Sequence, residues 1–217
     1  MSKATLTMRT ILRQAPVIPV ITLDDAAHAV PLAEALVAGG LPVIEVTLRT
    51  PAGLAAIRAM RDAVPAAIVG AGTVVNSVQF EAAVAAGSQF VVSPGFSPRL
   101  AAAAVQQGVP YLPGATTPTE IMAAMDAGLD TLKFFPAAQS GGASMLRALA
   151  SPLAAVAFCP TGGITLANVG DYLSLPNVLC VGMSALVTPE QLAAGDWAAI
   201  RDAAAVAASL RRHSGAG

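Results

Sequence analysis

The stretch Thr131-Leu-Lys-Phe-Phe-Pro-Ala137 is a short apolar run, typical of a buried strand, with one lysine inside it. The chain has only two lysines, and the other, Lys3, lies close to the N-terminus. A lysine in this setting is either a structural residue, paired with an acid or snorkelling, or an amine that attacks a carbonyl. Arginine cannot replace it in the second role, because a guanidinium stays protonated in proteins.

Apolar runs of this kind recur along the chain, each followed by an alanine-rich segment with helical periodicity. Their centres lie roughly 20–26 residues apart, the length of one strand, one helix and two short loops. The predicted strands are residues 17–21, 43–47, 67–71, 90–93, 110–113, 131–134, 156–159 and 178–181. This pattern predicts an α/β fold that is a single-domain (β/α)8 TIM barrel.

The predicted barrel covers residues 1–217, with a short N-terminal helix in residues 1–15 and a frayed tail at 209–217. An open doubly wound sheet is the structural alternative, although no Gly-x-Gly-x-x-Gly motif follows the first run. Helix starts are predicted at four Ser/Thr-Pro pairs, and two of these also match the capping box. The pairs begin at Thr50, Ser97, Thr117 and Thr188, and the capping boxes end at Glu120 and Gln191.

Composition excludes several classes of protein. The net charge is −1 with no basic block, which argues against nucleic-acid binding. No apolar run is long enough to span a membrane, and the first residues lack a signal-peptide core, so we expect a cytoplasmic protein. Cys159 and Cys180 are interpreted as reduced, buried thiols. No Cys/His spacing of zinc type occurs, and we expect neither a metal nor another cofactor.

Glu45 interrupts an apolar run in the same way as Lys133 does. Strand alternation places each on one face of an even-numbered strand, and even-numbered strands of a barrel supply the same side-chain layers. The carboxylate and the amine are therefore expected near each other at the barrel mouth. A structural ion pair is the alternative, although desolvation offsets much of the attraction in such a pair. We expect Glu45 to move protons, through a water, rather than to hold the ammonium tightly.

Thr161-Gly-Gly-Ile-Thr165 follows the seventh run and is predicted to open a helix, where backbone amides favour an anion. Gly182 and Ser184 end the eighth run, and the loops after strands seven and eight are the usual phosphate site of the TIM barrel. The alternative for the Gly-Gly pair is an ordinary turn. Arg49, after the second run, is either a clamp for a carboxylate or a surface charge.

These segments together resemble the 2-keto-3-deoxy-6-phosphogluconate (KDPG) aldolases, also called 4-hydroxy-2-oxoglutarate (KHG) aldolases. The similarity keeps a consistent order from about residue 10 to 205. The segments that carry it are Glu45-Val-Thr-Leu-Arg-Thr50, Val69-Gly-Ala-Gly-Thr73, Ser93-Pro-Gly95, Lys133-Phe-Phe-Pro-Ala137 and Pro160-Thr-Gly-Gly-Ile164.

The resemblance implies a class I, metal-independent aldolase on a (β/α)8 barrel, assembled as a homotrimer. It implies Lys133 as the Schiff-base lysine and Glu45 as the proton-transfer residue. The substrate-binding residues that it implies are Arg49 and Thr73 at the pyruvate carboxylate, Pro94 and Phe135 along the site, and Thr161, Gly162, Gly163 and Ser184 at the phosphate. Trp197, Met122 and Met125 are interpreted as packing in the core or between subunits.

The predicted reaction is cleavage of 2-dehydro-3-deoxy-6-phosphogluconate to pyruvate and D-glyceraldehyde 3-phosphate, a step of the Entner–Doudoroff route. Cleavage of 4-hydroxy-2-oxoglutarate to pyruvate and glyoxylate is predicted beside it. The alternatives are another phosphosugar barrel enzyme, such as an isomerase, an epimerase or an aldolase of the galactonate branch, and a non-catalytic binding barrel. An isomerase needs no lone lysine among phenylalanines.

Overall fold

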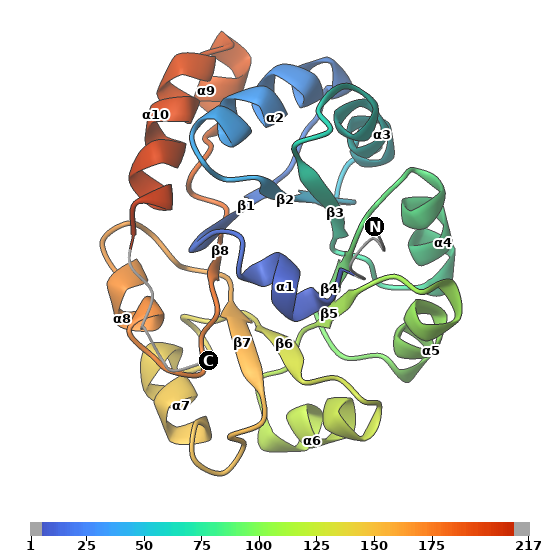
Figure 1. Cartoon of the computed structure of the whole chain (residues 1–217), viewed down its shortest axis with the longest axis vertical. Helices are drawn as coiled ribbons and strands as arrows, with labels where there is room; N and C mark the ends of the chain where they lie inside the picture. Colours follow the sequence, from blue (N-terminus) through green and yellow to red (C-terminus); the bar gives the residue numbers. More distant parts are fainter. Residues whose placement is uncertain (1–5, 211–217) are drawn as a thin grey trace, which may run out of the picture.

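A computed structural model describes residues 6–210, in which parallel strands alternate with helices (Figure 1). The strands are β1 Val17–Ile21, β2 Val43–Thr47, β3 Ile68–Gly72, β4 Val91–Ser93, β5 Tyr111–Pro113, β6 Thr131–Phe134, β7 Ala157–Pro160 and β8 Val181–Met183. One parallel sheet has the order β5-β4-β3-β2-β1-β8, and β6 pairs with β7 in a second. Isolated parallel bridges run from Gly114 to Lys133 and from Thr161 to Gly182.

Figure 1 shows the strands around the centre of the molecule, with the later helices outside them and α1 across the middle. The helices are α1 Met8–Leu12, α2 Ala29–Ala38, α3 Gly53–Ala63, α4 Ser77–Ala85, α5 Pro98–Gln107, α6 Pro118–Asp126, α7 Gly142–Leu149, α8 Val169–Leu173, α9 Pro189–Ala194 and α10 Trp197–Ala208. A short 3-10 helix, Ala26–His28, precedes α2.

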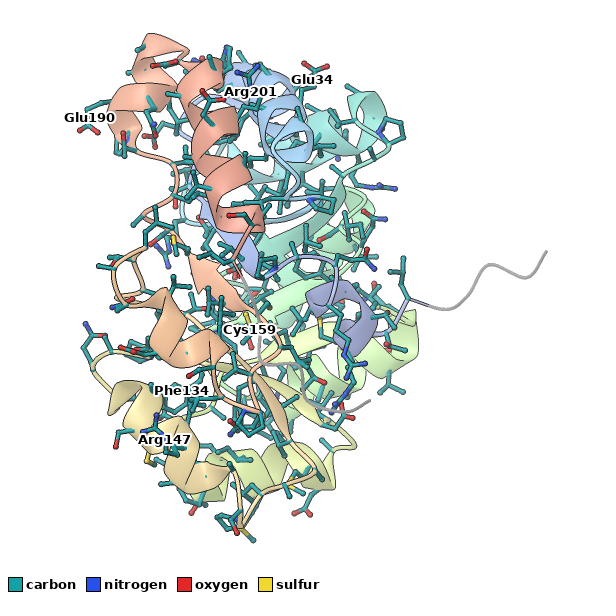
Figure 2. The ribbon with its side chains drawn as sticks, turned by 60° about the vertical axis from the view of Figure 1, so that its left-hand side comes forward. Glu34, Phe134, Arg147, Cys159, Glu190 and Arg201 are labelled. Atoms are coloured by element: carbon teal, nitrogen blue, oxygen red, sulfur yellow. The ribbon has the colours of Figure 1, made fainter. Side chains whose placement is uncertain are left out.

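Apolar side chains form two cores because successive strand residues point to opposite faces of the sheet. The larger core lies between strands and helices, and Phe134 belongs to it, with its ring centre 6.3 Å from that of Phe158 in an edge-to-face arrangement. The smaller core joins Met8, Ile11 and Leu12 of α1 to strand residues that include Cys159. Figure 2 shows Cys159 in the interior, while charged side chains such as Glu34, Arg147, Glu190 and Arg201 lie on the helices outside.

The strand predictions agree closely with the structure except at the end of the chain. Three strands have the predicted bounds, four are displaced by one residue at one or both ends, and the eighth is wrong by several residues. Val178 forms only an isolated bridge to Phe158, whereas regular pairing begins where Val181 meets Val17 of β1. β8 therefore begins at the residue where β1, its second neighbouring strand, starts to pair with it.

The predicted helix caps are confirmed at Ser97, Thr117 and Thr188, the last two as capping boxes. The backbone N–H groups of Thr116 and Thr117 hold the pKa of the Glu120 carboxyl below its usual value. The prediction at Thr50 is wrong, because α3 begins at Gly53 with Ala52 as its N-cap. The Thr50 hydroxyl donates instead to the carbonyl of Leu23, which ties the β2–α3 loop to the end of β1.

The two ends of the chain are described in part. Within the predicted N-terminal helix the structure has α1 at Met8–Leu12, with residues 1–5 outside the described part. At the other end α10 stops at Ala208, and residues 211–217 of the predicted tail lie outside the described part. Within residues 6–210, no helix has both the length and the apolar character that crossing a membrane requires.

Candidate active site

A cavity of about 350 Å³ lies at the carboxyl ends of the strands. Lys133 of β6 lines it together with residues that follow the ends of β2, β6, β7 and β8. The complete lining is Val20, Arg49, Lys133, Phe135, Pro136, Gln139, Thr161, Gly162, Gly163 and Ser184. Parallel strands end at a common edge, so residues far apart in the sequence converge here.

Lys133 and Glu45 form a buried pair at this cavity. The Lys133 Nζ donates to Glu45 Oε1 at 3.1 Å and lies 3.5 Å from Oε2. Their side chains are only 6% and 5% exposed. The predicted meeting of the two side chains is confirmed, but the expectation that Glu45 does not hold the ammonium tightly is wrong, because the two head groups are in direct contact. Both residues are central in their strands and point inward, which leaves no room between their head groups.

The neighbours of this pair are apolar or aromatic. Val20 stands opposite Glu45 in the strand register, and Cys159 stands opposite Lys133. The Lys133 Nζ lies 5.2 Å from the centre of the Phe135 ring, within reach of a cation–π interaction. In such a low-dielectric setting, the attraction between the two head groups is stronger than it would be in water.

Arg49 lines the same cavity as Lys133 and is held by Thr73. The Arg49 Nε donates to Thr73 Oγ1 at 3.2 Å, and the Arg49 side chain lines the cavity. Thr73 has a φ of 58°, the left-handed region that β-branched residues rarely adopt. Within the described chain it is the one non-glycine residue with positive φ. Strain of this kind persists where the surrounding structure imposes it, often at functional sites.

The loop after β7 forms another part of the cavity wall. Gly162 and Gly163 have φ values of 101° and 72°, so this turn requires glycine. The prediction that the segment opens a helix is wrong, because these positive φ values interrupt a right-handed helix and α8 starts only at Val169. The Asn168 side chain closes the loop by donating from Nδ2 to the carbonyl of Gly163 and accepting from the N–H of Thr165.

The family model described as "KDPG and KHG aldolase" matches residues 8–203 of this sequence. The chain belongs to the KDPG and KHG aldolase family. The match includes both members of the buried pair and every residue that lines the cavity.

Individual members of the KDPG and KHG aldolase family are similar over most of their length. The KHG/KDPG aldolase of Escherichia coli K12 is 52% identical, over 86% of this chain and 88% of that protein. A Zymomonas mobilis ZM4 KDPG aldolase, solved with 3-phosphoglycerate, has a TM-score of 0.92 at 46% identity, covering 98% and 100% of the two chains. A Legionella pneumophila KDPG aldolase, solved with pyruvate captured as a covalent carbinolamine intermediate, has a TM-score of 0.90 at 42% identity, covering 93% and 98%.

Most of the predicted site residues meet in one place in this member of the KDPG and KHG aldolase family. Seven line the cavity: Arg49, Lys133, Phe135, Thr161, Gly162, Gly163 and Ser184. Glu45 and Thr73 do not line it but touch residues that do. Pro94 is half-buried outside the lining, and its carbonyl lies where a Cβ on Gly114 would stand, next to the bridge to Lys133.

Three lining residues were not predicted: Val20, Pro136 and Gln139. Pro136 continues the Lys133-Phe-Phe-Pro segment, and its position directly after Phe135 was an available signal. Val20 has only strand alternation to mark it, since an inward valine looks like any other core residue. Gln139 is a polar residue in a loop, and no sequence pattern indicates that this loop folds back over Gly163.

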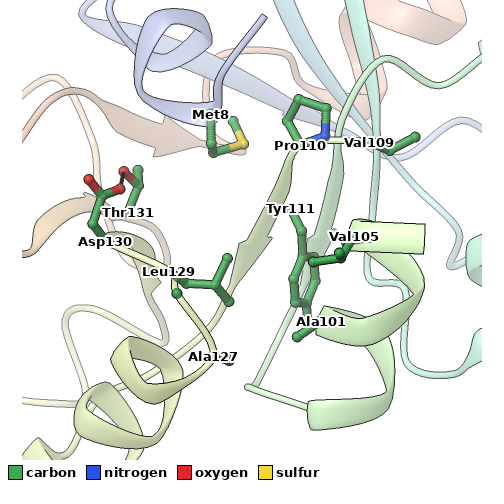
Figure 3. A pocket seen from close by; sticks show the side chains of 12 residues that line it. Met8, Ala101, Val105, Val109, Pro110, Tyr111, Ala127, Leu129, Asp130 and Thr131 are labelled. Carbon is green, nitrogen blue, oxygen red and sulfur yellow. Dashed lines mark hydrogen bonds between the residues drawn. The ribbon is translucent and has the colours of Figure 1, made fainter. Parts of the chain in front are cut away.

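A second cavity, of about 240 Å³, lies at the amino ends of β5 and β6 and is lined mostly by apolar side chains (Figure 3). Its acid, Asp130, pairs with Arg9 at 3.1 Å. This second cavity lacks the lysine amine and the glycine-containing loop that line the first cavity.

In the described part of the chain, no three His, Cys, Asp or Glu side chains are grouped so that they could hold a metal ion.

The backbone of Thr73 leads to a stability prediction. At ordinary φ values an alanine is more stable than a glycine by about 0.5–1 kcal/mol, but a left-handed residue reverses this preference. We therefore expect Thr73→Gly to be more stable than Thr73→Ala by about 1 kcal/mol, measured by urea unfolding with equal m-values. Both variants lose the contact to Arg49, so that loss cancels in the comparison. An alanine variant that is the more stable of the two would show that Thr73 is not strained.

Proposed function

We propose that this protein is a class I aldolase that cleaves KDPG to pyruvate and D-glyceraldehyde 3-phosphate, and KHG to pyruvate and glyoxylate. The observation that carries the proposal is the buried Lys133–Glu45 pair, 3.1 Å apart beside the cavity of a chain of this family. The names of the relatives, which include both substrates, support it.

In the proposed reaction, the neutral Lys133 Nζ attacks the C2 ketone and forms a carbinolamine, which loses water to give an iminium. Removal of the C4 hydroxyl proton lets the C3–C4 bond break. Its electron pair moves towards the iminium and forms an enamine, while C4 becomes the aldehyde carbonyl. Protonation at C3 and addition of water to the imine release pyruvate and regenerate the lysine.

Glu45 is proposed to carry the protons. A proton that crosses the 3.1 Å contact from the ammonium to the carboxylate leaves a neutral amine and a neutral acid. This exchange creates no unbalanced charge in the buried site, which would be costly. The same carboxyl group adjoins the nitrogen that holds the enamine, so it is placed to return a proton to carbon.

The two ends of the cavity are proposed to bind the two charged groups of the substrate. Arg49, oriented by Thr73, offers N–H groups that suit the planar carboxylate of the keto acid. On the β7 and β8 side, Gly162, Gly163 and Ser184 are proposed to bind the phosphate. The positive φ values of the two glycines let the backbone approach an anion closely.

Replacing Ser184 by alanine tests the phosphate end. A hydrogen bond to a charged group contributes about 1.5–3 kcal/mol, so Ser184→Ala lowers kcat/KM for KDPG by about tenfold or more. Pyruvate carries no phosphate, and its trapping on Lys133 by borohydride is expected to stay unchanged. Ser151→Ala, at an exposed position outside the cavity, serves as the control. Equal losses of turnover and trapping would contradict the assignment.

We also propose that the strands close into a (β/α)8 barrel that forms a single domain. The proposal is supported by the bridges from Gly114 to Lys133 and from Thr161 to Gly182, which link the two sheets on both sides. It is also supported by the position of the helices outside the strands in Figure 1, since an open doubly wound sheet carries helices on both faces.

The homotrimer is proposed as well, and its support is a set of exposed apolar side chains on neighbouring elements. Val78 on α4, Val105 on α5 and Met122 on α6 are 76%, 79% and 57% exposed. This exposure argues against a core position for Met122 and leaves packing between subunits as its role. Light scattering after size exclusion tests the assembly. The cytoplasmic location stays a prediction from the sequence.

The experiment that tests the proposed function is borohydride reduction in the presence of pyruvate, followed by mass spectrometry of the protein. A stable adduct at Lys133 supports imine formation, and an isomerase, an epimerase or a non-catalytic barrel gives none. Incubation with KDPG then yields two products, pyruvate and D-glyceraldehyde 3-phosphate, from one substrate. Comparison with the galactonate epimer separates the two aldolase branches, since both use a lysine imine.

A further inference from the structure

Gly72, the last residue of β3, leaves the space that the Glu45 side chain occupies. A Cβ at position 72 would lie 2.2 Å from Glu45 Oε1, 2.7 Å from its Cγ and 2.8 Å from its Cδ. Protein Cβ atoms essentially never make contacts under 3.0 Å. Gly72 is not among the glycines with positive φ, so its backbone conformation does not demand glycine. The lack of space for a side chain, and not the backbone conformation, therefore explains why residue 72 is a glycine.

The carboxylate has little room to move away from such a Cβ. Glu45 is 3% exposed, and the Lys133 amine lies within 3.5 Å of both of its carboxylate oxygens. The atom nearest the added carbon, Oε1, is also the oxygen that accepts from Nζ at 3.1 Å. A methyl group at position 72 therefore displaces the oxygen that receives the proton.

We propose that Gly72 is a positioning residue for the reaction, and this rests on the proposed function. Its missing side chain leaves room for the Glu45 carboxylate at hydrogen-bond distance from the Lys133 Nζ. Gly72 touches neither substrate nor proton, and it acts only through the position of Glu45. The identity of residue 72 thus decides whether the acid and the amine are aligned.

The reaction offers two readouts that separate a displaced Glu45 from general damage. Borohydride trapping of pyruvate reports whether Lys133 forms its imine, and deuterium exchange at the pyruvate methyl reports the proton transfer assigned to Glu45. Gly72→Ala is expected to slow exchange at least tenfold, with a smaller loss of trapping. A variant that is only destabilised loses both in proportion to the folded fraction.

Gly70 provides a matched control on the same strand. Gly70 stands opposite Glu45 in the β2–β3 register, but the three atoms nearest a Cβ at position 70 all belong to the Phe90 ring, about 2.4 Å away in the core, and not to Glu45. Gly70→Ala therefore lowers the unfolding temperature but keeps the ratio of exchange to trapping of the parent protein. A similar fall in this ratio for both alanine variants would overturn the proposal.

A double-mutant cycle with Glu45→Ala completes the test, because truncating Glu45 removes the three atoms that lie nearest the new methyl group. In the Glu45→Ala background, Gly72→Ala is expected to change neither the exchange rate nor the unfolding temperature. Gly70→Ala is expected to lower the unfolding temperature by as much as it does in the parent protein. If Gly72→Ala alone fails to fold, a double variant as stable as Glu45→Ala supports the contact, and a double variant clearly less stable than Glu45→Ala overturns it.

The proposed function and this inference fail separately. If the parent protein gives no pyruvate adduct with borohydride, the aldolase proposal itself is wrong. If the parent traps pyruvate and exchanges its methyl protons while Gly72→Ala does so equally well, only the role of Gly72 is wrong.

Discussion

Lys133→Ala abolishes the pyruvate adduct with borohydride and lowers turnover of KDPG by at least about 10⁴-fold, the scale expected when a covalent nucleophile is removed. The reason is that Lys133 is the amine that lines the cavity, and neither water nor Arg49 replaces it as an electron sink. The measurements are adduct mass and the rate of pyruvate release. Retention of more than a few per cent of the turnover would refute the role.

Stability complicates this variant, because Lys133 forms an ion pair with the buried Glu45. Removing one member of a buried pair costs about 3–5 kcal/mol, whereas replacing both by neutral residues of similar volume is often harmless. The double variant Lys133→Met and Glu45→Gln therefore serves as the folded, inactive reference. Lys133→Arg is a second control, which keeps the positive charge but forms no imine. Activity in Lys133→Arg would mean that charge alone matters.

Glu45→Gln lowers pyruvate trapping less than turnover and methyl exchange, both of which slow by about 10²-fold or more. Positioned acid–base groups contribute about 10²–10⁴ in rate, and glutamine keeps the shape and an acceptor oxygen while losing the basic carboxylate. The contact of 3.1 Å to Lys133 Nζ places the loss at the proton transfers and not at binding. Deuterium exchange followed by proton NMR checks the result.

Glu45→Asp is the matched control for position. It keeps the carboxylate but withdraws it by one methylene from the Nζ that it contacts at 3.1 Å. We expect intermediate exchange rates, because the chemical group is present but poorly aligned. Exchange at the parent rate in Glu45→Gln would remove Glu45 from the chemistry and leave it as a structural partner of the lysine.

The strands and most caps were predictable because their signals are local. Apolar runs gave β2 and β6 with their observed bounds, and the hydroxyl before a proline predicted the starts of α5 and α6. Alternation also placed Glu45 and Lys133 on inward faces. These features depend on sterics and hydrogen bonding within a few residues, so a single sequence contains them.

The sequence predictions that were wrong share a different cause. Thr50 donates to the carbonyl of Leu23 in the segment after β1, and the eighth strand starts where β1 begins to pair with it. The loop over Gly163 is closed by Asn168, which replaces the expected helix start. In each case a partner distant in the chain, or a side chain folding back, decided the local structure.

The sequence by itself determined that a lone lysine and a lone glutamate interrupt apolar strands and face the same interior, because side-chain alternation requires nothing beyond the strand. Only the tertiary structure decided that the two touch at 3.1 Å, that Thr73 is left-handed beside Arg49, and that Gly72 makes room for the carboxylate. These distances depend on strand register and on packing between segments far apart in the chain, which no local pattern encodes.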